Sequence, residues 1–174
     1  MLSFTNLALR RGPNLLFEDV SFVIHRDKKV GLIGANGVGK TSLFKMITGE
    51  LEVEDGYLDY PQDLRISYLA QEVVGTDQRA VEYVLEGDKQ LIQIQQQIKS
   101  AEANEQFDKL GELHEIFNSL DGHSALSKAE QLMVGLGFTQ EDLNKTVKDF
   151  SGGWRVRLNL ARTLMQPSDL LLLD

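Results

Sequence analysis

Hydrophobic and polar residues alternate along several short segments of the chain, which is the pattern of β-strands with one buried face. The segments that alternate, or that form a short apolar run, are residues 2–9, 20–24, 30–33, 57–60, 66–69 and 170–173. Turn residues stand at positions 12–14 and 55–56. The sequence therefore predicts a protein built on β-strands, with the apolar run 30–33 as a strand that leads into a glycine-rich loop.

The middle of the chain has the spacing of amphipathic helices, and no strand is expected between residues 76 and 130. Two sets of apolar residues show it: Leu91, Ile94, Ile98 and Ala101, then Leu110, Leu113, Phe117 and Leu120. The pattern breaks at residues 103–106, which predicts an antiparallel helical hairpin. A further helix is expected to end near Gly137, and Thr139 with Asp142 resembles a capping box that begins a short helix.

Composition excludes several classes of protein. The chain has 174 residues, of which 42% are hydrophobic, and it contains no cysteine. Disorder, disulfides and thiolate metal sites are therefore not expected. The sequence has no signal-peptide layout and no apolar run near the roughly 20 residues that span a bilayer, so we expect a soluble, cytoplasmic protein with no membrane partner. Because it stops inside an apolar run, we also expect a fragment of a longer protein.

A glycine-rich loop carries the clearest chemical signal. Its residues are Gly34, Ala35, Asn36, Gly37, Val38, Gly39, Lys40 and Thr41, which fit the phosphate-loop pattern in full. Glycines let backbone N–H groups approach phosphates closely, and the helix expected from Thr41 to Ile47 favours anions at its start. We predict that Lys40 reaches the β- and γ-phosphates, that Thr41 ligates Mg²⁺, and that Ser42 completes the binding residues of an ATP site.

A second helix start follows near the end of the chain. Ser151 is a good N-cap residue, and Gly152 and Gly153 bare the backbone before an amphipathic helix. By itself this is an ordinary helix cap. The order of features changes that interpretation: a phosphate loop, a glutamine (Gln71) after a strand, this segment, and then four leucines and Asp174.

That order resembles ATP-binding cassette (ABC) domains over the entire chain. The resemblance implies an α/β fold of the P-loop NTPase class, with an ABC ATPase core, an antiparallel β subdomain and an inserted helical arm. It implies that Ser151, Gly152 and Gly153 are the ABC signature and bind ATP held by another domain. It also implies that Lys40 and Gln71 are catalytic residues and that Gln71 contacts Mg²⁺ as well. It implies that Asp174 is the Walker B aspartate that helps hold Mg²⁺.

Within ABC proteins the chain is most similar to the ABC-F group and its YheS-type members, because Trp154 and Arg155 follow the glycines and the helical insertion is long. The group implies an ATPase that acts on the ribosome, with rRNA, tRNA or ribosomal protein as partners. It also implies a second ABC domain in the same chain that completes the ATP sites. The expected domains are residues 1–75 (first part of the core), 76–137 (helical arm) and 138–174 (signature helix and Walker B strand).

Two departures from the family pattern matter. Arg11 stands where the family often stacks an aromatic residue on adenine, although an arginine can stack by a cation–π contact. The glutamate that polarises the attacking water should follow Asp174 and lies outside this sequence, so we expect no turnover from residues 1–174 alone.

Several interpretations stay open. The ATP-binding subunit of a membrane transporter is the main alternative function; a DNA-repair type ABC ATPase would need a longer coiled coil. Trp154 either contacts a partner or packs at the helix start. Tyr68 is interpreted as an ordinary strand residue, and Asp169 as part of a surface turn. Residues 76–130 hold 11 acidic and 5 basic residues, so the arm touches either ribosomal protein or RNA through a few basic side chains.

Overall fold

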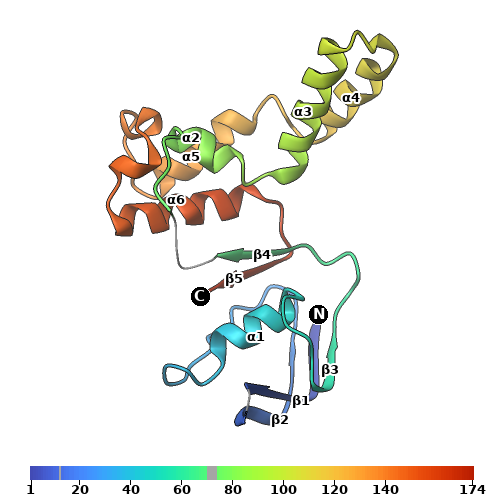
Figure 1. Cartoon of the computed structure of the whole chain (residues 1–174), viewed down its shortest axis with the longest axis vertical. Helices are drawn as coiled ribbons and strands as arrows, with labels where there is room; N and C mark the ends of the chain where they lie inside the picture. Colours follow the sequence, from blue (N-terminus) through green and yellow to red (C-terminus); the bar gives the residue numbers. More distant parts are fainter. Residues whose placement is uncertain (12, 70–73) are drawn as a thin grey trace. The chain divides into compact units, whose positions relative to one another are not determined.

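The computed structural model describes residues 1–11, 13–69 and 74–174, and the chain divides into two compact units (Figure 1). The first, which we call the sheet unit, comprises residues 1–68 and 169–174; the second, the helical unit, comprises residues 69–168. In chain order the sheet unit contains β1 (Leu2–Arg11), β2 (Asn14–Ile24), α1 (Lys40–Ile47), β3 (Asp55–Asp59), β4 (Ile66–Leu69) and β5 (Leu170–Leu173).

The helical unit contains the remaining elements. Its helices are α2 (Ala80–Leu85), α3 (Lys89–Ala103), α4 (Phe107–Ser119), α5 (Ala125–Gly135) and α6 (Gly152–Met165). The 3₁₀ turns η1 (Asp142–Asn144) and η2 (Val147–Asp149) lie between α5 and α6. The expected helical hairpin is confirmed as α3 and α4 (Figure 1).

An antiparallel sheet in the order β2–β1–β3 confirms the expected antiparallel subdomain. Its inward face does not keep a strict period of two, because Leu2 and Phe4 are buried and the pattern resumes one residue late at Leu7. The register shifts between Phe4 and Leu7, where Asn6 has φ 49°. This irregularity lets ten residues of β1 keep their apolar side chains on one face.

The expected turn at Asp55–Gly56 was wrong, because both residues lie inside β3. Gly56 has φ 83°, and a Cβ there would lie 2.3 Å from the carbonyl oxygen of Asn6. The glycine is needed where β3 crosses the irregularity of β1, so it marks a close backbone approach and not a chain reversal.

Helix α1 packs on the strands of the sheet unit through one face. Leu43, Met46 and Ile47 are buried in a cluster with side chains of β1 and with Leu172 of β5. The helix ends at Thr48, and Gly49 has φ 76° and donates its N–H to the Met46 carbonyl, which confirms the expected C-terminal cap.

Strands β4 and β5 form a separate two-stranded sheet and run in the same direction (Figure 1). Arg65 and Asp169 hold their starts together: Arg65 Nε lies 2.9 Å from Asp169 Oδ2, and the Asp169 N–H donates to the Arg65 carbonyl. Asp169 is an exposed bend, as expected. The guanidinium of Arg65, and then the Arg65 N–H, donate hydrogen bonds to its carboxylate, which lowers the pKa of Asp169 to about 2.

The prediction of a strand at residues 30–33 was wrong. Residues 25–39 contain no strand in the structure, and Val30 and Ile33 are 60% and 95% exposed. A strand needs a neighbouring backbone as well as apolar side chains, and the described strands pair elsewhere.

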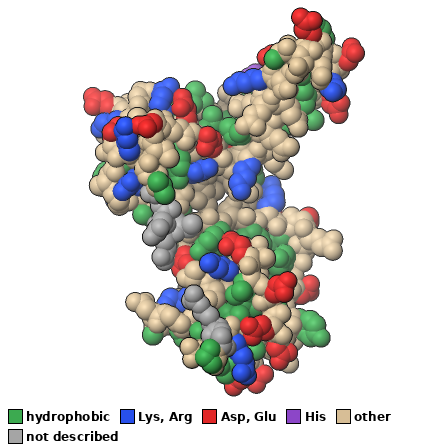
Figure 2. All heavy atoms as spheres, in the orientation of Figure 1, with side chains coloured by type: hydrophobic (Ala, Val, Ile, Leu, Met, Phe, Trp, Pro, Cys, Tyr) green, Lys and Arg blue, Asp and Glu red, His purple; other side chains and the backbone are tan. Residues whose placement is uncertain are grey.

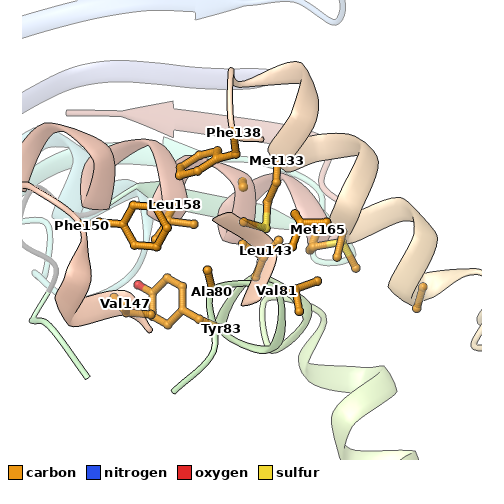
Figure 3. Close-up of a cluster of buried hydrophobic side chains, with 14 of the residues drawn as sticks. Ala80, Val81, Tyr83, Met133, Phe138, Leu143, Val147, Phe150, Leu158 and Met165 are labelled. Carbon is orange, nitrogen blue, oxygen red and sulfur yellow. The ribbon is translucent and has the colours of Figure 1, made fainter. Parts of the chain in front are cut away.

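The helical unit has its own hydrophobic core (Figure 3). Helix α6 contributes Leu158, Ala161 and Met165, while Phe138 and Phe150 come from the segments around η1 and η2. The Thr139 hydroxyl and N–H both donate to the Asp142 carboxylate, which confirms the short helix start expected there. Sequence reasoning missed α2, because six residues are too few to show a helical period.

Candidate functional site

The phosphate loop ends in backbone conformations that favour glycine. Gly37 has φ 80° and Gly39 has φ 106°, and Gly39 is also the N-cap residue of α1. A side chain at Gly39 would place its Cβ 3.3 Å from atoms of Leu16 and Phe17, so space and backbone both select glycine there. The loop therefore delivers Lys40 and Thr41 as the first two residues of α1.

The start of α1 is an anion-binding end by its electrostatics. Its first intrahelical bond runs from the Leu43 N–H to the Gly39 carbonyl, at 2.9 Å. The N–H groups of Lys40, Thr41 and Ser42 precede that bond and so have no acceptor within the helix. The first turn carries no acidic residue, which leaves the positive end of the helix dipole uncompensated.

Lys40 folds back over the loop. Its Nζ donates to the carbonyl oxygens of Gly34 and Ala35, at 2.8 and 2.9 Å. These two hydrogen bonds hold the ammonium group of Lys40 against the phosphate loop. A phosphate at the start of α1 would meet both the ammonium group and the helix N–H groups.

A second part of the site is built by β4, β5 and α1. The Tyr68 hydroxyl donates to Asp174 Oδ2 at 3.1 Å, and the Tyr68 ring meets the Phe44 ring edge-on, with centroids 6.2 Å apart. Burial, followed by the hydrogen bond to Asp174, raises the pKa of Tyr68, so its hydroxyl is a donor at neutral pH. Phe44 lies three residues after Thr41, and Leu172 packs with α1, so Asp174 belongs to the same unit as the loop.

The donors suit Mg²⁺ better than a softer metal. Thr41 offers a hydroxyl and Asp174 a carboxylate, and Mg²⁺ is typically bound by one or two carboxylates, waters and substrate phosphates. Among the residues that the structure describes, no three His, Asp or Glu side chains gather to hold a metal by themselves.

The remaining predicted site residues are distributed differently. Gln71 and the side chain of Arg11 lie outside the described residues, so both assignments stay predictions. Ser151 is the extended N-cap of α6 in the helical unit, although its side chain makes no capping hydrogen bond. Gly152 and Gly153 are exposed, and a Cβ at either would meet no atom within 4 Å. Their backbone is therefore open to a ligand.

Trp154 packs within the chain at the start of α6. Its ring lies 4.8 Å from the Phe138 ring and carries the Arg157 guanidinium 4.7 Å above it. Of the two interpretations of Trp154, packing at the start of α6 is therefore the one that the described contacts support.

Comparisons with known proteins agree with this geometry. The family model described as "ABC transporter" matches residues 17–174. The chain belongs to this family, whose domains are ATP-binding cassettes with the P-loop NTPase fold. Two solved structures share the fold: an ABC transporter in an inward-facing conformation (TM-score 0.67, 19% identity, 99% of this chain and 58% of the other) and one described as an ABC transporter ATP-binding protein from Pyrococcus furiosus (TM-score 0.70, 18% identity, 99% and 74%).

Within the family the resemblance to ABC-F proteins is confirmed. The chain is 44% identical over its whole length to "Probable ATP-binding protein YheS" of Haemophilus influenzae and 38% identical to YheS of Escherichia coli K12. It is 35% identical over 97% of its length to "ATP-binding cassette sub-family F member 2" of Bos taurus. The chain spans 27% of the length of the YheS proteins and 26% of the bovine protein.

One further finding concerns membranes. None of the helices in the described part of the chain is both long enough and apolar enough to cross a lipid bilayer.

Proposed function

We propose that this chain binds ATP with Mg²⁺ through Gly34–Thr41 and works as an ABC domain of a cytoplasmic, ribosome-associated ABC-F ATPase. The observation that carries the ATP site is the loop itself: glycines at φ 80° and 106° lead into an α1 start with no acidic first turn, and Lys40 is folded over it. The family match and the YheS relatives, named as ATP-binding proteins, support it.

The net charge of −8 does not weaken this proposal. A phosphate site is local, because charges farther away than the Debye length of about 8 Å are largely screened at physiological salt. The α1 end presents N–H groups and one ammonium group within that distance. A bound phosphate therefore interacts mainly with these nearby groups and much less with the net negative charge of the whole chain.

Hydrolysis is proposed to need a second ABC domain. By the family pattern, Ser151 and the Gly153 N–H contact the γ-phosphate of ATP held by another domain, and they lie in a different unit from Lys40. Phosphoryl transfer depends on positioning and charge stabilisation, so an unpaired domain binds ATP yet turns it over poorly. A robust ATPase rate from residues 1–174 alone would contradict this.

The ribosomal role is supported by the α3–α4 hairpin and by the ABC-F likeness. Figure 2 shows acidic side chains around the free end of the hairpin, where Glu102, Glu105 and Asp108 are exposed. An acidic surface disfavours RNA phosphates along its length. We therefore propose that the hairpin contacts ribosomal protein, or RNA through a few basic residues such as Lys99 and Lys109.

Co-sedimentation with ribosomes tests the whole proposal. The full-length protein should pellet with ribosomes in the presence of ATP. Lys40→Ala should abolish this dependence on ATP. Lys45→Ala, which changes an exposed residue in the last turn of the same helix, should leave the dependence on ATP unchanged. The family match also covers ATP-binding subunits of membrane transporters. Co-purification with a membrane protein, and no ATP-dependent ribosome binding, would favour that alternative.

A further inference from the structure

Tyr68 contacts both α1, the helix that follows the phosphate loop, and Asp174 at the end of β5. Its ring contacts Phe44, which lies on α1 three residues after Thr41, at a centroid distance of 6.2 Å and an interplanar angle of 67°. Its hydroxyl donates to Asp174 Oδ2 at 3.1 Å. The phenol therefore bridges the helix that follows the phosphate loop and the carboxylate at the end of β5.

We propose that Tyr68 is a positioning residue for the divalent cation, and this inference rests on the proposed function. The torsion that turns an aspartate carboxylate is broad and nearly two-fold, so an unsupported carboxylate samples many orientations. A hydrogen bond to Oδ2 restricts that rotation and leaves Oδ1 for the cation. Mg²⁺ demands a near-ideal octahedral arrangement, so it is sensitive to such restriction.

The surroundings of Tyr68 suit this role. Its ring is fixed by the edge contact with Phe44 and by packing against the cluster that includes Leu43 and Leu172. The hydroxyl therefore approaches Asp174 from a side chain with little freedom of its own. Positioning is most effective when the supporting residue is itself locked by packing.

Tyr60 offers a matched control. It packs against the same cluster, and its hydroxyl donates to the Ile47 carbonyl at 3.4 Å, at the opposite end of α1 from the loop. Tyr68→Phe and Tyr60→Phe each remove one hydroxyl and keep the ring. The two variants differ in whether the lost hydrogen bond reaches Asp174.

The experiment measures cation and nucleotide binding separately in the full-length protein. Binding of Mn²⁺, used as a spectroscopic probe for Mg²⁺, is followed by electron paramagnetic resonance in the presence of ATP. ATP affinity is also measured in EDTA, without any divalent cation. Tyr68→Phe should weaken Mn²⁺ binding about tenfold, as expected for loss of an outer hydrogen bond to a metal ligand. Its metal-free ATP affinity should stay within about twofold of wild type, and Tyr60→Phe should match wild type in both measurements.

Three results would overturn the inference. Equal Mn²⁺ affinity in Tyr68→Phe and Tyr60→Phe would show that the hydroxyl does not act on the cation. Equal loss of ATP affinity with and without metal would show a merely structural role. A wild-type protein that binds no ATP in either condition would refute the proposed function itself, and this inference with it.

Discussion

Gly39 carries a prediction whose size follows from the structure. Its φ of 106° lies well beyond the left-handed region near +57°, so alanine there should cost about 2 kcal/mol in backbone strain. The new Cβ would also lie 3.3 Å from Leu16 and from Phe17, which adds about 1 kcal/mol for overpacking. Gly39→Ala should therefore cost about 3 kcal/mol.

Gly37→Ala is the matched control for stability. Gly37 has φ 80°, but a Cβ there meets no atom within 4 Å, so the expected cost is only about 1 kcal/mol. The two variants should thus differ by about 2 kcal/mol, which is roughly 30-fold in an equilibrium constant.

The strain of Gly39→Ala can appear in two measurements. If the loop keeps its shape, the free energy of unfolding falls, which urea unfolding followed by circular dichroism detects. If the loop relaxes instead, the competent conformation is depopulated and the apparent ATP affinity falls by that fraction. A Gly39→Ala variant that matches Gly37→Ala in unfolding and wild type in ATP affinity would refute the reasoning.

Two further predictions concern the helical unit. Leu158→Ala removes a fully buried side chain of α6 and should lower stability by about 2–5 kcal/mol, seen in the fluorescence of Trp154, whereas Leu164→Ala, at a site already 36% exposed, should cost less than about 1 kcal/mol. Hydrogen bonds from Lys145 and then Thr139 hold the pKa of Asp142 at about 2, below its ordinary 3.8. Its contribution is therefore present above pH 3.8 and lost as the pH falls through about 2, so Asp142→Asn should destabilise the protein at pH 7, with the difference from wild type shrinking over that window. A difference that stays constant down to pH 2 would contradict the assignment.

The parts of the fold that could be predicted are those with local causes. Gly49 follows the end of α1 because a residue in the left-handed conformation caps a helix. The connection between α3 and α4 falls at residues 103–106, where the helical spacing of apolar residues stops. The strand expected at residues 30–33 shows the limit of this reasoning. Apolar side chains are a local property, whereas strand pairing depends on a neighbouring backbone far away in the sequence.

In the candidate site, too, the features with local causes could be predicted and those that join distant parts of the sequence could not. The loop from Gly34 to Thr41 was predictable because its chemistry lies in eight consecutive residues. Tyr68 was read as an ordinary strand residue, and nothing local to it reveals a hydrogen bond to Asp174, which lies 106 positions later. The Arg65–Asp169 pair, 104 positions apart, was missed for the same reason.

The affinity for ATP tests the central claim most directly. Titration calorimetry with Mg²⁺·ATP should show saturable binding by the wild-type protein. Lys40→Ala should weaken it roughly 10- to 150-fold, the equivalent of about 1.5–3 kcal/mol for hydrogen bonds to a charged group. Lys45→Ala should leave the affinity within about twofold of wild type, because the side chain lies in the last turn of α1. Equal affinities of wild type and Lys40→Ala, or no binding by the wild-type protein, would contradict the account.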